Sequence, residues 1–193
     1  MTPMNRISRF DIYQNQLKDL KQTDAQLGCI PTNIAAALQA YGVRDASENG
    51  IQTAYRYAIS FEKVKSGVLG KLEEMIGQNV SSRFELEHQA GIRSYDEWWQ
   101  KLTNCIGKKD APVIFPCNVN GNCHAVTAIG YDDEKVEIYD PWPGNPKEIL
   151  AVLTSDLKKK WGSGKLHGEI LAVRKKQQQS LSVPEPGPQA KPA

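Results

Sequence analysis

Three residues spread along the chain have the types and the order of a thiol-dependent catalytic group. Cys29 lies in the stretch Gly-Cys-Ile-Pro-Thr-Asn, His124 follows a Gly-Asn-Cys sequence, and Asp140 stands directly before a proline. A cysteine can supply a nucleophile, a histidine can supply a base, and an aspartate can orient that base. The order Cys, His, Asp therefore predicts nucleophilic attack by sulfur on a carbonyl carbon.

The position of Cys29 favours it over the other cysteines as the nucleophile. Pro31 is tolerated in the first turn of a helix, and apolar residues at helical spacing from Ile34 to Tyr41 predict a helix over 29–41. A helix N-terminus stabilises a thiolate, and its free N–H groups can hold an oxyanion. The other thiols lie inside a predicted helix or beside predicted strands: Cys105, Cys117 and Cys123.

His124 and Asp140 are expected to meet through a β-hairpin. Residues 123–131 and 135–139 are rich in strand-forming residues and are separated by Asp-Asp-Glu, which predicts two paired strands. The turn between them brings Asp140 back beside His124, where the carboxylate can fix the tautomer and angle of the imidazole. The two other histidines of the chain are not followed by such a hairpin: His88 and His167.

The elements that surround these residues predict an α+β domain, with helices first and an antiparallel sheet second. Apolar periodicity predicts helices over 29–41, 51–59, 61–77 and 94–106, the last opened by a capping box at Ser94. In that last helix, Trp98 and Trp99 are expected to be a core residue and a rim residue. Strands are expected over 112–116, 123–131, 135–139, 148–153 and 168–174, with a short helix over 155–161.

The composition is that of one globular domain followed by a tail. The chain has 193 residues, of which 40% are hydrophobic. We expect one domain over residues 1–176. The proline-rich segment 177–193 has almost nothing large to bury and is expected to be disordered.

Charge and apolar patterning argue against several classes of partner. The net charge of +2 comes from 24 basic and 22 acidic residues, which gives no strong attraction for nucleic acid. No stretch has the length and apolar character of a signal peptide or a membrane span. A cytoplasmic location is therefore expected, or export by a leaderless route, and the four cysteines are interpreted as thiols.

A metal ion or cofactor is not expected. Cys117, Cys123 and His124 could suggest zinc ligands, but no second pair of ligands with zinc-finger spacing accompanies them. The thiol chemistry described above needs no cofactor.

The segment around Cys29 and the His/Asp hairpin together resemble the papain-like cysteine peptidases, most closely the branch related to the bacteriocin-processing C39 peptidases. The resemblance covers roughly residues 16–173 and is most specific in His-Ala-Val-Thr-Ala-Ile-Gly-Tyr-Asp from His124 and in the Asp-Pro at residue 140. It implies a papain-like fold in which the helix that begins at Cys29 packs on the sheet. It also implies an upstream glutamine in the oxyanion hole, for which Gln22 is favoured and Gln26 is the reserve choice.

The resemblance implies a stand-alone cysteine peptidase that cleaves a peptide or protein substrate through an acyl-enzyme. It does not carry over the double-glycine leader specificity of transporter-linked members, and Ile30 stands where many relatives have a small residue. The same triad and fold also serve glutamine deamidases and transglutaminases, including bacterial effectors and toxins. A catalytically silent binding module is the third hypothesis.

Overall fold

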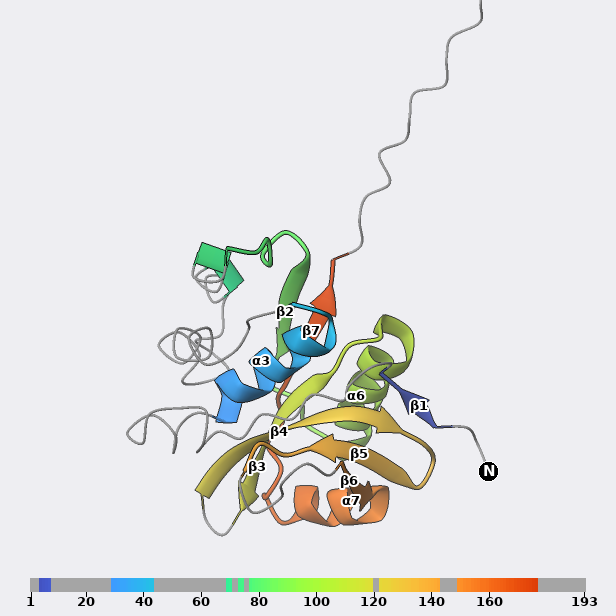
Figure 1. The fold of residues 1–193 in the computed structure, drawn as a ribbon. Helices are drawn as coiled ribbons and strands as arrows, with labels where there is room; N and C mark the ends of the chain where they lie inside the picture. The colour runs from blue at the N-terminus through green and yellow to red at the C-terminus, as the bar shows by residue number, and fades with distance from the viewer. Residues whose placement is uncertain are drawn as a thin grey trace, which may run out of the picture.

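The computed structural model describes residues 4–7, 29–43, 69–70, 73–74, 77–119, 122–142 and 149–176 (Figure 1). In these ranges the elements follow one another as β1 (Asn5–Arg6), α3 (Cys29–Ala40), β2 (Phe84–Gln89), α6 (Tyr95–Lys109), β3 (Val113–Val119), β4 (Asn122–Tyr131), β5 (Lys135–Tyr139), β6 (Leu150–Leu153), α7 (Thr154–Gly162) and β7 (Ile170–Lys175). The predicted helix over 51–59, most of that over 61–77 and the tail over 177–193 lie outside the described residues.

The described strands form one seven-stranded sheet. Its order is β2-β7-β3-β4-β5-β6, β1 pairs with β4, and every pairing is antiparallel. The predicted α+β class, with helices early in the chain and an antiparallel sheet late, is confirmed. The five predicted strands are present, with ends that differ from the prediction by a few residues.

Two strands come from the half of the chain that the sequence pattern assigns mainly to helices, which corrects the prediction there. They are the short β1 and the six-residue β2. β2 pairs along its whole length with β7, from Phe84 opposite Lys175 to Gln89 opposite Ile170, and Glu85 forms an ion pair with Arg174. This partner lies more than eighty residues later in the sequence, so no local hairpin signal announces it.

Helix α3 is buried on nearly all sides. Ten of its twelve residues are buried, and its sequence is rich in alanine and isoleucine, as expected for a helix that is apolar all round. It packs on β4. The start of α3 is therefore held against the central strands of the sheet.

Helix α6 packs on the other face of the same strands. Ser94 caps its first turn by accepting a hydrogen bond from the N–H of Glu97, as the predicted capping box requires. The fully buried Trp98 meets Phe115 edge to face, with ring centroids 5.2 Å apart. Phe115 is opposite Val126, so the side chains of these two residues lie on the same face of the sheet. Thr127 follows Val126 in β4, so its side chain lies on the other face, where it contacts α3.

Candidate active site

Cys29 is the first residue of α3. Pro31 stands in the first turn, where its missing N–H breaks no helical hydrogen bond. The side chain of Cys29 is half-buried and packs against the core. The thiol therefore lies at the positive end of a helix, beside N–H groups that have no partner within the helix.

The imidazole of His124 and the carboxylate of Asp140 are joined by a short hydrogen bond. The Nε2–H of His124 donates to Oδ1 of Asp140 over 2.7 Å, and the two side chains are 10% and 13% exposed. His124 lies near the start of β4, and Asp140 directly follows β5. The Asp132 carboxylate holds the turn of this hairpin by accepting hydrogen bonds from two backbone N–H groups.

The Cys29 side chain lies close enough to the same imidazole to raise its pKa. Because Nε2 is engaged by Asp140, Nδ1 is the ring nitrogen left for the sulfur. Burial lowers the pKa of His124, but the hydrogen bonds and negative charges of Asp140 and Cys29 outweigh burial and raise that pKa to about 9. At neutral pH His124 is therefore an imidazolium placed between the Asp140 carboxylate and the Cys29 side chain.

Trp142 belongs to the same site, although the sequence pattern does not single it out. Its backbone N–H donates to Oδ1 of Asp140 over 2.9 Å. Its indole meets the His124 ring edge to face at a centroid distance of 5.9 Å and is 44% exposed. The exposed ring is thus part of the surface that a bound molecule would meet beside His124.

The other three thiols are free but differ in their surroundings. Burial raises the pKa of Cys105, and burial together with the Asp140 charge raises the pKa of Cys117 to about 12. Cys123 is exposed, yet partial burial and the charges of Cys29 and Glu169 raise its pKa as well. All three thiols are thus held in the protonated form at neutral pH, which is the unreactive form.

The structure brings together Cys29, His124 and Asp140, and their catalytic roles stay a prediction. Both candidate oxyanion glutamines, Gln22 and Gln26, lie outside the described residues. Elsewhere, the His88 ring is paired with the carboxylate of Glu169 over 3.1 Å. Within the ranges given above, no group of three or more His, Cys, Asp or Glu residues could hold a metal ion.

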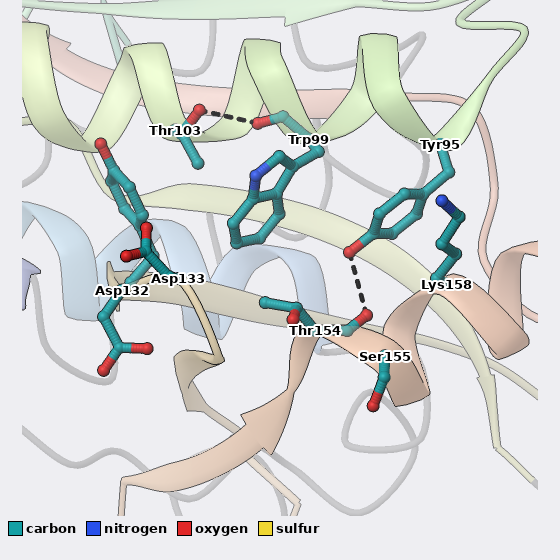
Figure 2. Close-up of a pocket in the computed structure, with 9 residues that line it drawn as sticks. Tyr95, Trp99, Thr103, Asp132, Asp133, Thr154, Ser155 and Lys158 are labelled. Carbon is teal, nitrogen blue, oxygen red and sulfur yellow. Dashed lines mark hydrogen bonds between the residues drawn. The ribbon is translucent and has the colours of Figure 1, made fainter. Parts of the chain in front are cut away.

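A cavity of about 350 Å³ is lined in part by Tyr131, the last residue of β4, and so lies at the end of β4 opposite to His124. Figure 2 shows the side chains around this cavity. Trp99, Tyr95 and Tyr131 supply its aromatic wall, and Lys158 lies near its rim. Tyr131 is seven residues beyond His124 on β4, which corresponds to roughly 23 Å of extended strand. This cavity is therefore separate from the thiol site, and Trp99 lines it.

No helix of the described ranges is long and apolar enough to cross a membrane.

The fold and the site define a class of protein: an α+β, papain-like domain with a cysteine at a helix start beside a paired histidine and aspartate. The model of the Peptidase_C39 like family matches residues 12–165, and the chain belongs to this family. The resemblance inferred from the sequence is thereby confirmed. No curated protein matches the sequence.

Three solved structures are similar to this chain to different degrees. A protein of Bacillus anthracis described as a C39-like peptidase has a TM-score of 0.55 and 16% identity, covering 90% of this chain and 98% of its own. The peptidase domain of Streptococcus ComA has a TM-score of 0.48 and 12% identity, covering 78% of this chain and 93% of its own. A double-glycine motif protease from an AMS/PCAT transporter has a TM-score of 0.45 and 18% identity, covering 78% and 86%. At such identities, the first structure bears on the fold alone.

Proposed function

We propose that this protein is a cysteine peptidase that cleaves peptide or protein amides through an acyl-enzyme. The observation that carries the proposal is the position of the His124 imidazole, which is hydrogen-bonded to Asp140 and lies beside the Cys29 side chain at the start of α3. Membership of the Peptidase_C39 like family supports the same chemistry.

The reaction begins from the ion pair in which the Cys29 proton lies on His124, so that a thiolate faces an imidazolium. The thiolate forms a C–S bond to the amide carbonyl carbon, and the carbonyl oxygen becomes an oxyanion. The imidazolium then gives its proton to the amide nitrogen, the C–N bond breaks and the amine leaves. A water molecule loses a proton to neutral His124, attacks the thioester and releases a carboxylic acid with the Cys29 thiol.

Asp140 holds the imidazole at the correct angle and stabilises its protonated form through the 2.7 Å hydrogen bond. The backbone N–H of Cys29 is a donor for the oxyanion. Gln22 is the proposed second donor, with Gln26 as the reserve choice. A Gln22→Ala variant that loses kcat while Gln26→Ala keeps it would support this assignment.

The first test compares the reactivity of the four thiols. Alkylation with limiting iodoacetamide at pH 6, followed by peptide mapping, should modify Cys29 at least about ten times faster than Cys123. Cys123 is a suitable control because it is exposed and close in the fold, but does not begin a helix. Equal rates at these two thiols would contradict an activated nucleophile.

The second test measures amide cleavage on a mixture of peptides by mass spectrometry. Cys29→Ala should lower the rate by at least about 1,000-fold, whereas Cys123→Ala should leave it within about twofold. New peptide termini support a peptidase. Glutamine converted to glutamate, with the chain intact, would show instead a deamidase on the same site. Full activity in Cys29→Ala would refute both enzymes.

A further inference from the structure

The buried amide of Asn33 joins the helix that carries the thiol to the strand that carries the imidazole. Asn33 lies one turn after Cys29 in α3 and is fully buried. Its Nδ2 donates to the carbonyl oxygen of Cys29 over 2.7 Å and to that of Ala125 over 2.8 Å. Its Oδ1 accepts from the hydroxyl of Thr127 over 2.5 Å. One side chain thus contacts the nucleophile's own backbone and two residues of β4.

The pairing of β4 explains why Ala125 needs a donor from outside the sheet. Ala125 is opposite Pro116 of β3. On the other side, the last registered pair is Thr127 with Tyr139, and continuing that register places Pro141 opposite Ala125. Proline has no N–H, so neither directly opposite residue can donate to the Ala125 carbonyl. Asn33 supplies the missing hydrogen bond next to His124.

Asparagine has the atoms that this position requires. Two carbonyl oxygens face the NH₂ group, and one hydroxyl faces the amide oxygen, so all three neighbours determine the orientation of the amide. An aspartate of the same shape would place a carboxylate oxygen against the carbonyl oxygens of Cys29 and Ala125, and all of these atoms are acceptors. An apolar residue would remove the Asn33 hydrogen bonds to the Ala125 carbonyl and the Thr127 hydroxyl. Asparagine is a poor helix former, and a buried amide is costly unless it is paired. The residue is thus matched to its polar contacts.

We propose that Asn33 and Thr127 are positioning residues that set the separation of the Cys29 thiol and the His124 imidazole. The amide ties the first turn of α3 to the residue after His124, and the Thr127 hydroxyl fixes which way the amide points. A small shift of α3 along β4 would lengthen the sulfur–nitrogen contact on which proton transfer depends. The expected effect on turnover rests on the proposed function, whereas the expected effect on the thiol–imidazole pair does not.

The test uses two shape-conserving substitutions and two controls. Thr127→Val removes the hydroxyl, and Asn33→Asp removes both donors. Thr127→Ser keeps the hydroxyl and is the rescue variant. Thr32→Val is the matched control, because Thr32 is equally buried in α3 and its hydroxyl has no hydrogen-bond partner among the described residues. All four are compared with the wild-type protein for folding by circular dichroism.

Turnover is the first readout. Thr127→Val and Asn33→Asp should lower kcat by about 10- to 100-fold with KM within about twofold, since alignment is lost and binding is not. Thr127→Ser and Thr32→Val should keep kcat within about threefold. If folded Thr127→Val keeps wild-type kcat, or if Thr32→Val is impaired equally, the positioning role is refuted. Should Asn33→Asp fail to fold, Thr127→Val with its Ser rescue still decides the question.

The pH dependence of Cys29 alkylation is the second readout and needs no substrate. Thr127→Val should move the pH of half-maximal alkylation by at least about half a unit, whereas Thr32→Val should leave it in place. A wild-type protein that cleaves no peptide, but whose alkylation profile changes in Thr127→Val, would refute the peptidase and support the positioning role. A profile that is unchanged in folded Thr127→Val would refute the positioning role, whether or not peptides are cleaved.

Discussion

The proton on His124 controls the pH range in which the Cys29–His124 pair can work. The pKa of His124 is raised from 6.5 to about 9, because the hydrogen bonds and charges of Asp140 and Cys29 outweigh burial. A histidine with a raised pKa stays protonated below that value and loses its proton as the pH rises through it. The imidazolium that donates to the leaving amine in the proposed mechanism is therefore present at neutral pH and is lost above about pH 9.

Asp140→Asn should move the alkaline limit of activity to lower pH. The variant loses the carboxylate charge and the charge-assisted hydrogen bond, so the pKa of His124 falls. We expect the alkaline limb of kcat/KM against pH to shift down by at least about one unit. The remote Asp96→Asn, which changes an exposed carboxylate in α6, should leave the profile unchanged. An identical alkaline limb in Asp140→Asn would contradict the role assigned to the carboxylate.

At the residue scale, the sequence predicts the pairs that depend on local order. Cys29 is found at a helix start and Asp140 beside His124, since a proline in the first turn and a short hairpin are local features. Asn33 was not predicted as part of the site. Its signal is a polar residue four positions after Cys29 in a mostly apolar helix, but its partners in β4 lie more than ninety residues away.

At the element scale, Gly168 lets the segment before β7 lie directly against the segment before α6. The N–H of Ile92 donates to the carbonyl of Gly168 over 2.9 Å. A Cβ on residue 168 would lie 2.1 Å from the Ile92 carbonyl oxygen, a backbone atom that cannot rotate away. The two segments therefore approach one another as closely as they do because residue 168 has no side chain.

Gly168→Ala should lower the free energy of unfolding by about 3 kcal/mol, the upper part of the range for overpacking. Urea denaturation followed by circular dichroism measures this difference. Gly162→Ala in α7 is the control, because a Cβ there meets nothing within 4 Å. That variant should be neutral, or more stable by up to about 1 kcal/mol. Equal stability of the two variants would contradict the close contact at Gly168.

The elements that sequence patterns predict are those stabilised by interactions between residues that are close in the sequence. α6 has a capping box and charges that suit both helix ends, and β4 and β5 are joined by a three-residue turn. The sequence pattern does not predict β2, because the alternation of apolar and charged residues in this short segment is a weak signal for a strand. It becomes a strand by pairing with β7, which the local sequence does not identify.

At the scale of the whole molecule, Trp98 is the largest fully buried side chain among the described residues. It contacts Phe115 of the sheet, Trp161 of α7 and Tyr95 of its own helix. These contacts join α6 and α7 to the sheet in one core. Stability of the active site should therefore depend on a residue that does not belong to it.

Trp98→Ala should lower the free energy of unfolding by about 3–5 kcal/mol, the usual cost of emptying a large aromatic site. Denaturant unfolding gives this value, and faster alkylation of the buried Cys105 and Cys117 reports the same opening. Trp142→Ala, which removes a 44% exposed indole, should change stability by no more than about 0.5 kcal/mol. Comparable losses in the two variants would be inconsistent with a single core centred on Trp98.

The sequence by itself determined the α+β class, the family and the three candidate catalytic residues, because helix starts, hairpins and apolar periodicity are properties of neighbouring residues. Only the tertiary structure decided how α3 meets β4. That contact depends on the Asn33 amide, which donates to the Ala125 carbonyl, and on Pro116, which is opposite Ala125 and has no N–H to donate. Hydrogen bonds between segments so far apart follow from the packed arrangement and cannot be deduced from local sequence.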